Sequence, residues 1–297
     1  MNDGAVERIG RWRAAIDAEL AQVAAGRDDL PDVLRDAIHY SLTGEGKRFR
    51  GLLLIASYDA LGGTGDASAL AAAIEVVHAY SLVHDDLPCM DDDSMRRGRP
   101  TTHLKYGVAT ATVAGVAMVP LAVEQTLRGA SRLGLDDAAT RRLVETLMRA
   151  SGASGMVGGQ LMDLDAEGRS LSVAGLEAIH QAKTGALIVA ALTMGGIAAA
   201  AREHTVSELA AAGAQLGLAF QIADDVLDAT ATSESLGKTA GRDAVLEKST
   251  YASVLGVATA RQRSDALVAD AMTRLDAAGL RTHTIDRLAH FVAARRS

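Results

Sequence analysis

Two clusters of aspartates are the residues of this chain whose types and spacing most clearly indicate chemistry. The first is His84–Asp93 (HDDLPCMDDD) and the second is Gln221–Asp228 (QIADDVLD). In the second cluster the polar positions recur at i, i+3, i+4 and i+7, which predicts one face of a helix with apolar neighbours. Carboxylates crowded on such a face repel one another and lose hydration. A hard divalent cation with oxygen ligands, such as Mg²⁺ bridged to substrate phosphates, relieves both costs.

The first cluster is expected to contain a helix end. Asp85 and Asp91 are six residues apart and would point to different faces of an unbroken helix. Pro88 lies between them and is expected to end the helix, so that the intervening residues loop out and both carboxylates converge. One such cluster is equally typical of a solvated acidic face. Two clusters, each after an apolar helix, favour a pair of metal-binding motifs.

Basic residues are grouped in the same parts of the sequence. Gly46–Arg50 (GKRFR) precedes an apolar run, and Arg96–Arg99 (RRGR) follows the first acidic cluster. Lys183, Lys238 and Lys248 are isolated cations beside apolar or glycine-containing segments. Arginine forks and lysine point charges are the groups with which proteins hold diphosphates. Each cation alone is typical of a protein surface, so the interpretation depends on their occurring together.

The elements that position these residues are predicted to be helices. All four prolines (Pro31, Pro88, Pro100 and Pro120) lie at or before position 120, and the rest of the chain, rich in Ala and Leu, favours long helices. Neither sustained period-two alternation nor a hairpin signal is present. Ser172 is expected to begin one helix, and Thr205 with Glu208 to form a capping box for another. The simplest architecture is a single all-α domain, residues 1–297, of about ten or more helices.

The composition narrows the possible function classes. The chain has 297 residues, a net charge of −7 and 3% aromatic residues, which argues against nucleic acid as a partner. Its single cysteine, Cys89, is typical of a reducing cytoplasm. The N-terminal residues 1–13 lack the apolar core of a signal peptide. Two uncharged stretches, Tyr106–Val123 and Thr184–Ala201, are at the lower length limit of a membrane span and are interpreted as buried helices.

Taken together, these residues resemble the trans-isoprenyl diphosphate synthases, also called the polyprenyl synthetase family. The resemblance runs from about Gly44 to Gly256. The motifs that carry it are GKRFR at 46–50, HAYSLVHDDLPCMDDD at 78–93, RRGRPTTH at 96–103, GGQLMDLDAEG at 158–168, KTGALI at 183–188, FQIADDVLD at 220–228 and LGKTAGRD at 236–243. The long first motif, with two residues inserted around Pro88, is similar to that of bacterial farnesyl and plant-type geranylgeranyl synthases.

The resemblance implies a fold, a cofactor and roles for individual residues. The fold is a bundle of long helices around a deep cavity (the isoprenoid synthase fold), usually as a homodimer, with about three Mg²⁺ ions per active site and Mn²⁺ as an alternative. The positions that match the metal ligands are Asp85, Asp86, Asp91, Asp224 and Asp228. The positions that match the contacts of the allylic diphosphate are Arg96, Lys183, Thr184, Gln221, Lys238 and Lys248. Those that match the isopentenyl diphosphate site are Lys47, Arg50, His78 and Arg97. The expected catalytic set is Asp85, Asp86, Asp91, Lys183, Asp224, Asp225 and Lys238.

The implied reaction joins isopentenyl diphosphate head to tail with dimethylallyl or geranyl diphosphate. Metals and cations neutralise the departing diphosphate, the alkene attacks the allylic carbocation, and a proton is then lost. The cavity must be apolar and dry, because water would quench the cation. Tyr80 and Ser81, just before Asp85, match positions that limit product length in the family. A tyrosine there predicts farnesyl diphosphate as the product, with geranylgeranyl diphosphate as the alternative.

The chain departs from the family pattern around one helix. Val108 replaces an acidic residue, Gly115–Val116 replaces a Gly-Asp pair, and Pro120 falls inside a long helix, where a kink is expected. Gly51 stands where proline is common. These differences bear on the helix that lines the cavity or the dimer interface, and so on product length.

Three other functions fit the sequence less well than a prenyl elongase. A terpene cyclase of the same fold usually replaces the second aspartate motif, which is intact here. A generic acidic metal-binding protein would not carry the matched cations. A non-catalytic subunit that modulates another synthase typically loses part of one aspartate motif, and this chain retains both. The changes around Val116 and Pro120 keep such a subunit as a remote alternative.

Overall fold

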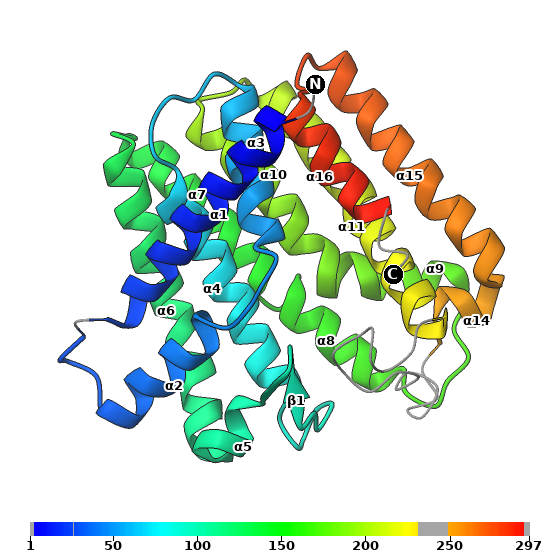
Figure 1. The fold of residues 1–297 in the computed structure, drawn as a ribbon. Helices are drawn as coiled ribbons and strands as arrows, with labels where there is room; N and C mark the ends of the chain where they lie inside the picture. The colour runs from blue at the N-terminus through cyan, green and yellow to red at the C-terminus, as the bar shows by residue number, and fades with distance from the viewer. Residues whose placement is uncertain (1–2, 26, 231–248, 294–297) are drawn as a thin grey trace. The chain divides into compact units, whose positions relative to one another are not determined.

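The computed structural model describes residues 3–25, 27–230 and 249–293, and it confirms the all-α prediction (Figure 1). These residues divide into two compact units. Unit 1 contains the described residues up to Ile55 together with Thr64–Val144. Unit 2 contains Ala56–Gly63 and the described residues from Glu145 onward.

Unit 1 is built around one buried helix. Its elements are α1 (Asp3–Ala24), α2 (Asp32–Leu42), the first part of α3 (Phe49–Ala60), α4 (Ser68–Asp85), β1 (Met95–Arg96), β2 (Arg99–Pro100), α5 (Thr102–Tyr106), α6 (Val108–Arg132) and the first part of α7 (Asp137–Ser151). Helix α4 packs against α1, α2 and α6. Its residues 68–77 are all buried, as expected of a helix that is apolar on every side. Gly129 lets α6 approach closely, because a Cβ there would lie 2.8 Å from the backbone nitrogen of Leu70.

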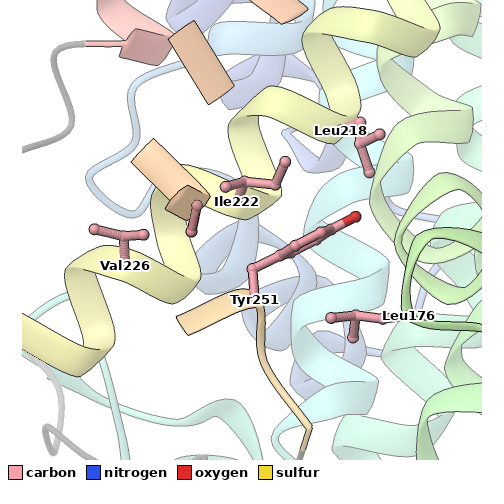
Figure 2. Packing of buried hydrophobic residues seen from close by; sticks show 6 residues of the cluster. Leu176, Leu218, Ile222, Val226 and Tyr251 are labelled. Atoms are coloured by element: carbon pink, nitrogen blue, oxygen red, sulfur yellow. The ribbon is translucent and has the colours of Figure 1, made fainter. Parts of the chain in front are cut away.

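Unit 2 is built around α11. Its elements are the ends of α3 and α7, then α8 (Met156–Asp165), α9 (Val173–His180), the π-helix η1 (Gln181–Gly185), α10 (Ala186–Ala198), α11 (Glu203–Thr230), α14 (Tyr251–Leu255), α15 (Val257–Ala277) and α16 (His283–Ala293). Helix α11 packs against every one of these from α9 onward. Part of this core joins Leu176 of α9, Leu218, Ile222 and Val226 of α11, and Tyr251 of α14 (Figure 2).

Two of the helix boundaries predicted from the sequence are confirmed by the structure, and one is wrong. Helix α4 ends at Asp85, three residues before Pro88, as predicted. The hydroxyl of Ser172 accepts a hydrogen bond from the backbone N–H of Gly175 and caps α9, as predicted. The predicted capping box at Thr205 is wrong. Helix α11 already begins at Glu203, so Thr205 lies inside its first turn.

Among the residues that the structure describes, three helical segments are long and apolar enough to cross a membrane. They are Val108–Arg132, Val173–Ala198 and Glu203–Thr230, and 39%, 67% and 56% of their most apolar windows are buried. The first and second contain most of the two uncharged stretches in the sequence, and the third was not anticipated. Polar residues of two of these helices bond to other helices of the same unit: Gln125 donates to Glu19 of α1 at 2.9 Å, and Glu208 accepts from Arg274 of α15 at 2.8 Å.

Candidate active site

The first aspartate motif forms a closed loop at the end of α4. The backbone N–H of Asp91 donates to the carbonyl of Asp85 at 2.9 Å, and that of Asp92 donates to the carbonyl of Leu87 at 3.1 Å. These bonds bring the backbone of Asp91 back beside Asp85, which agrees with the loop expected around Pro88. Cys89 is exposed in the same loop.

Asp86 is paired with an arginine. Its side chain is 3% exposed, and Oδ1 accepts from Nε of Arg96 at 2.9 Å as well as from Nη2 of the same fork. Nη2 of Arg96 also reaches Asp93 at 3.1 Å. Burial disfavours the charge of Arg96, but the carboxylate of Asp86 outweighs it, and the pKa of Arg96 is raised. The Asp86–Arg96 pair therefore joins the predicted metal motif to the predicted diphosphate-binding arginines.

A two-residue hairpin places these arginines. Strands β1 and β2 pair antiparallel, and Arg97 and Gly98 between them have φ values of +53° and +74°. Positive φ at both central residues is typical of the type I′ turn, which is favoured in two-residue hairpins because its twist matches that of the strands. Nη1 of Arg97 donates to the carbonyl of Glu45 at 2.9 Å. A Cβ at Gly46 would lie 2.7 and 2.8 Å from Nη1 of Arg48 and of Arg97, so glycine leaves room for the two guanidinium groups in their present positions.

A pocket in unit 1 collects this positive charge. Arg48, Arg96, Arg97 and Arg99 line it, together with His78 of α4. Burial lowers the pKa of His78 well below its ordinary value of 6.5, and the nearby arginines lower it further. The imidazole is therefore neutral at pH 7. Glu45, Glu75 and Asp86 also line the pocket, so its carboxylates offset part of the arginine charge. Guanidinium groups gathered around a neutral histidine are suited to an anion such as a diphosphate.

The other residues predicted for isopentenyl diphosphate lie on the same segment as Arg48. Lys47 is exposed and Arg50 is buried. The charge of Arg50 contributes to the lowered pKa of His78. Arg48, which was not a predicted site residue, is itself held by Asp17 of α1 at 2.6 Å and by the carbonyl of Gly44 at 2.7 Å.

In unit 2, the π-helix η1 presents Lys183 and Thr184. A Cβ at Gly159 of α8 would overlap the backbone nitrogen of Lys183, and one at Gly217 of α11 would lie 2.8 Å from the Cα of Gly185. Two glycines therefore allow α8 and α11 to press directly on the backbone of η1. Nζ of Lys183 donates to Asp163 of α8 at 2.7 Å, and Oγ1 of Thr184 donates to Gln221 of α11 at 3.0 Å.

The aspartates of the second motif differ in their surroundings. Asp224 is partly exposed, whereas Asp225 and Asp228 are 4% and 8% exposed. Asp225 accepts from Nε2 of Gln221 at 3.0 Å and from the backbone N–H of Tyr251 at 2.9 Å. The remaining two predicted residues, Lys238 and Lys248, lie outside the described residues.

The residues predicted to limit product length, Tyr80 and Ser81, lie five and four residues before Asp85, a little more than one turn of α4. The ring of Tyr80 packs edge-on against His84, with centroids 4.9 Å apart. Nε2 of His84 donates to the carbonyl of Thr112 on α6 at 3.0 Å, and a Cβ at Gly115 would overlap the His84 ring. Tyr80 is partly buried, which raises its pKa, and the charge of Asp85 raises it further. Ser81 donates its hydroxyl to the carbonyl of His78 on its own helix.

Two acidic residues of the site were not singled out from the sequence. Asp163 holds Lys183, and it lies three residues after Gln160 in the motif GGQLMDLDAEG. Glu75 is buried beside the arginine pocket, and Oε1 accepts from the backbone N–H of Gly51 at 2.9 Å. Its position, three residues before His78 on α4, was the available signal, because that spacing puts both on one helical face.

The donor set fits Mg²⁺ rather than a closed protein cage. Within the described residues, no three His, Cys, Asp or Glu side chains converge as a preformed metal site. Mg²⁺ keeps several waters and binds proteins through one or two carboxylates plus substrate phosphates. The carboxylates of Asp85 and Asp91, whose backbones meet in the loop, agree with such a site.

Comparison with known proteins gives a consistent result. The family model described as polyprenyl synthetase matches residues 31–279. The chain is 38% identical to the farnesyl diphosphate synthase of Bacillus subtilis (strain 168), over 90% of both chains. It is 41% identical to that of Escherichia coli (strain K12), over 88% of both chains. It is also 38% identical to geranylgeranyl pyrophosphate synthase 7 of Arabidopsis thaliana, over 90% of this chain and 78% of the other.

Solved structures agree with the fold. An apo FPP/GFPP synthase from Zymomonas mobilis matches with a TM-score of 0.85 and 33% identity, over 99% of this chain and 100% of the other. A geranyltransferase from Helicobacter pylori, complexed with magnesium and isoprenyl diphosphate, matches with a TM-score of 0.82 and 29% identity. The latter alignment covers 95% of this chain and 96% of the other.

Proposed function

Since this chain belongs to the polyprenyl synthetase family, we propose that it is a short-chain trans-prenyltransferase, which condenses isopentenyl diphosphate with an allylic diphosphate. The observation that carries the proposal is the arginine pocket of unit 1, which adjoins the first aspartate motif through the Asp86–Arg96 pair. Such a pocket suits a diphosphate, and the similar proteins are named farnesyl and geranylgeranyl diphosphate synthases.

We assign the isopentenyl diphosphate to this pocket. Arg97 and Lys47 would contact its phosphates, and Arg50 would add positive charge nearby. His78, neutral at pH 7, would donate or accept a hydrogen bond without adding to the crowded charge. Arg48 is buried, and its ion pair with Asp17 and its hydrogen bonds make it a support for the pocket wall rather than a mobile ligand.

The allylic diphosphate is assigned to the cations beside the two aspartate motifs. Arg96, Lys183, Thr184 and Gln221 are the described residues proposed to bind it, and Lys238 and Lys248 remain predictions. The proposed metal ligands are Asp85, Asp86, Asp91, Asp224 and Asp228. Mg²⁺ bound there would neutralise the negative charge that develops on the leaving diphosphate. A neighbour complexed with magnesium and isoprenyl diphosphate supports this choice of metal, whereas about three ions and use of Mn²⁺ are expectations from the resemblance.

The chain's own residues would then act by binding, orientation and exclusion of water. Lys183 is held by Asp163 and Thr184 by Gln221, so both are oriented before substrate arrives. The apolar residues of α4 and α11, the helices at which the two aspartate motifs lie, would keep water from the allylic cation. We propose the departed diphosphate as the acceptor of the proton, so that no side chain is assigned the role of base.

Farnesyl diphosphate is the proposed product. The partly buried ring of Tyr80, braced by His84, supports this choice, because bulk at that position would stop a longer chain. Relatives of both product lengths occur at similar identity, so the geranylgeranyl product is the alternative.

We further propose a single catalytic domain of residues 1–297 that acts as a cytoplasmic homodimer. The family match from 31 to 279 includes residues of both units, which supports one domain. Exposed apolar residues on one face of α6 support a dimer: Val113 is 53% exposed, Val116 60% and Leu127 47%. The bonds of Gln125 and Glu208 to other helices support buried helices rather than membrane spans.

The test is a product assay. The purified protein is incubated with Mg²⁺ and isopentenyl diphosphate, and separately with dimethylallyl, geranyl or farnesyl diphosphate. Dephosphorylated products are identified by mass, with Asp91→Asn as the control for contaminating activity. Farnesol from the first two primers, with farnesyl diphosphate not extended, is expected. Geranylgeraniol from every primer would replace the product assignment, and no product from any primer with either Mg²⁺ or Mn²⁺ would refute the enzymatic function.

A further inference from the structure

We propose that Asp225, the second aspartate of the second motif, is a positioning residue that fixes the amide of Gln221 and through it the hydroxyl of Thr184. It would therefore not bind metal, although it is adjacent to the proposed ligand Asp224. This inference rests on the proposed function, in which Gln221 and Thr184 bind the allylic diphosphate.

Both carboxylate oxygens of Asp225 already have partners within unit 2. Oδ1 accepts from Nε2 of Gln221 at 3.0 Å, and Oδ2 accepts from the backbone N–H of Tyr251 at 2.9 Å. The side chain is 4% exposed, whereas Asp224 is partly exposed. Because the side chain is buried and each oxygen is oriented by a partner in its own unit, the geometry favours a structural role for this carboxylate.

The second partner of Asp225 is held rigidly. Tyr251 is fully buried, and its ring stacks on His180 with centroids 5.6 Å apart and an interplanar angle of 25°. Figure 2 shows the ring of Tyr251 beside Leu176 of α9 and below Leu218 and Ile222 of α11. Nε2 of His180 lies 3.7 Å from Oδ2 of Asp225, which is too long for a hydrogen bond. The start of α14 therefore anchors Asp225 from one side.

Gln221, the other partner of Asp225, connects this carboxylate to Thr184, a proposed substrate contact. An ionised carboxylate can only accept hydrogen bonds, so Asp225 determines which end of the Gln221 amide faces it. The amide nitrogen turns to Asp225, and the amide oxygen turns to Thr184, whose Oγ1 donates to it at 3.0 Å. The bond to Asp225 uses one of the two N–H groups of the amide, and the other is the donor that an anion can take.

The hydrogen bonds from Asp225 through Gln221 to Thr184 form a relay. The variant Asp225→Asn tests this relay, because asparagine has the shape of aspartate but carries an NH₂ donor in place of one acceptor oxygen. Asparagine can accept from Tyr251 through its oxygen, but its NH₂ group then faces the NH₂ group of Gln221. The Gln221 amide must turn over, which reverses its bond with Thr184. We expect the KM for geranyl diphosphate to rise about tenfold, with the KM for isopentenyl diphosphate and the Mg²⁺ concentration for half-maximal rate each within about twofold of wild type.

The matched control is Asp224→Asn at the adjacent position. Asp224 is a proposed metal ligand, so its replacement should raise the half-saturating Mg²⁺ concentration about tenfold or more. If Asp225→Asn raises the Mg²⁺ requirement as Asp224→Asn does, the positioning role is refuted while the proposed function stands. If wild type makes no product from any primer, the proposed function itself fails.

A double-mutant cycle tests whether Asp225 acts through its neighbours. Thr184→Val removes the hydroxyl at the far end of the relay. If the relay is real, adding Asp225→Asn to Thr184→Val raises the KM for geranyl diphosphate by much less than tenfold, because the two changes remove one arrangement. If the two substitutions instead raise the KM for geranyl diphosphate independently, so that their fold-changes multiply in the double variant, the relay is contradicted.

A measurement on wild type keeps the proposal testable if Asp225→Asn does not fold. A crystal structure with Mn²⁺ and a non-reactive geranyl thiolodiphosphate locates the metals by anomalous scattering. The proposal requires that every metal lie well beyond the coordination distance of about 2.2 Å from Asp225 and that its bonds to Gln221 and Tyr251 persist. A metal peak at that distance would overturn it.

Discussion

At the scale of single residues, the pocket of unit 1 is governed by repulsion between like charges. Arg48, Arg96 and Arg97 are close enough to one another and to His78 to shift pKa values. Burial lowers the pKa of Arg97, and the charge of Arg48 lowers it further. The pocket can hold this much charge because Asp17, Asp86 and backbone carbonyls neutralise or solvate part of it.

The lowered pKa of His78 predicts a pH-dependent stability. Below pH 6.5 the unfolded chain takes up a proton at His78 that the folded chain rejects, so its neutral form supports stability above that pH and loses it as the pH falls. The loss has a limit of about 1.4 kcal/mol per pH unit. We expect His78→Asn to lose less free energy of unfolding than wild type between pH 7.5 and 5.5 in urea titrations. His39→Asn removes a histidine at an exposed position of α2 and is the matched control variant. Equal pH slopes for wild type and His78→Asn would contradict the lowered pKa of His78.

The sequence and its family resemblance predicted residues that the structure brings together, but not the hydrogen-bond partners of those residues. Arg96, Arg97 and His78 were identified from the sequence, and the structure brings them to one pocket. Asp225 was assigned to the expected catalytic set through the resemblance to the family. Its partner Tyr251 is 26 residues further along the chain, and a bond of that separation leaves no periodic trace in the sequence.

At the scale of elements, η1 is the least regular part of unit 2 and carries two predicted substrate contacts. A π-helix is rare and usually occurs as a single wide turn at a functional site. Here Gly159 and Gly217 remove the Cβ atoms that would keep α8 and α11 away from the backbone of η1. The wide turn is therefore held from two sides by helix backbones rather than by side chains.

Replacement of Gly159 by alanine should damage both stability and activity. The added Cβ would overlap the backbone nitrogen of Lys183, and relief of this overlap requires the backbone of α8 or η1 to shift. We expect the free energy of unfolding to fall by about 1–3 kcal/mol and kcat to fall because Lys183 is displaced. Gly10→Ala is the control, since a Cβ at that exposed position of α1 meets nothing within 4 Å. It should gain about 0.5–1 kcal/mol. Chemical denaturation and steady-state kinetics of both variants measure these effects. A Gly159→Ala variant with wild-type stability and kcat would show that the close contact between α8 and η1 is not required.

Helix boundaries could be predicted where local chemistry sets them. Pro88 and Ser172 act on their own neighbours, and the ends of α4 and α9 follow. The capping box at Thr205 failed because α11 starts one half-turn earlier, at Glu203. The π-helix was not predicted, because its widening depends on glycines of two other helices and not on the sequence QAKTG itself.

At the scale of the whole molecule, the all-α class followed from composition and from the scarcity of proline, and the comparisons confirm the isoprenoid synthase fold. The oligomeric state did not follow, because it depends on a surface. Substitution of the family's acidic positions by Val108 and Val116 makes α6 more apolar, and both residues are exposed.

If this face of α6 is the dimer interface, a charge on it should separate the subunits. We expect wild type to be a dimer at micromolar concentration and Val116→Asp to be a monomer, because an unpaired buried carboxylate costs several kcal/mol. Val33→Asp, at an equally apolar and 53% exposed position of α2, is the control that should stay dimeric. Light scattering coupled to gel filtration measures both masses. A dimeric Val116→Asp with a wild-type circular dichroism spectrum would place the interface elsewhere.

The loop between Asp85 and Asp91 has a practical consequence for experiments in solution. It contains the chain's single cysteine, Cys89, and that side chain is exposed. A thiol-reactive fluorophore can therefore be attached at one defined point without any mutation. The probe would stand inside the aspartate loop, whose backbone is pinned at Asp91 and Asp92. Its emission would follow metal and diphosphate binding in real time, independently of product formation.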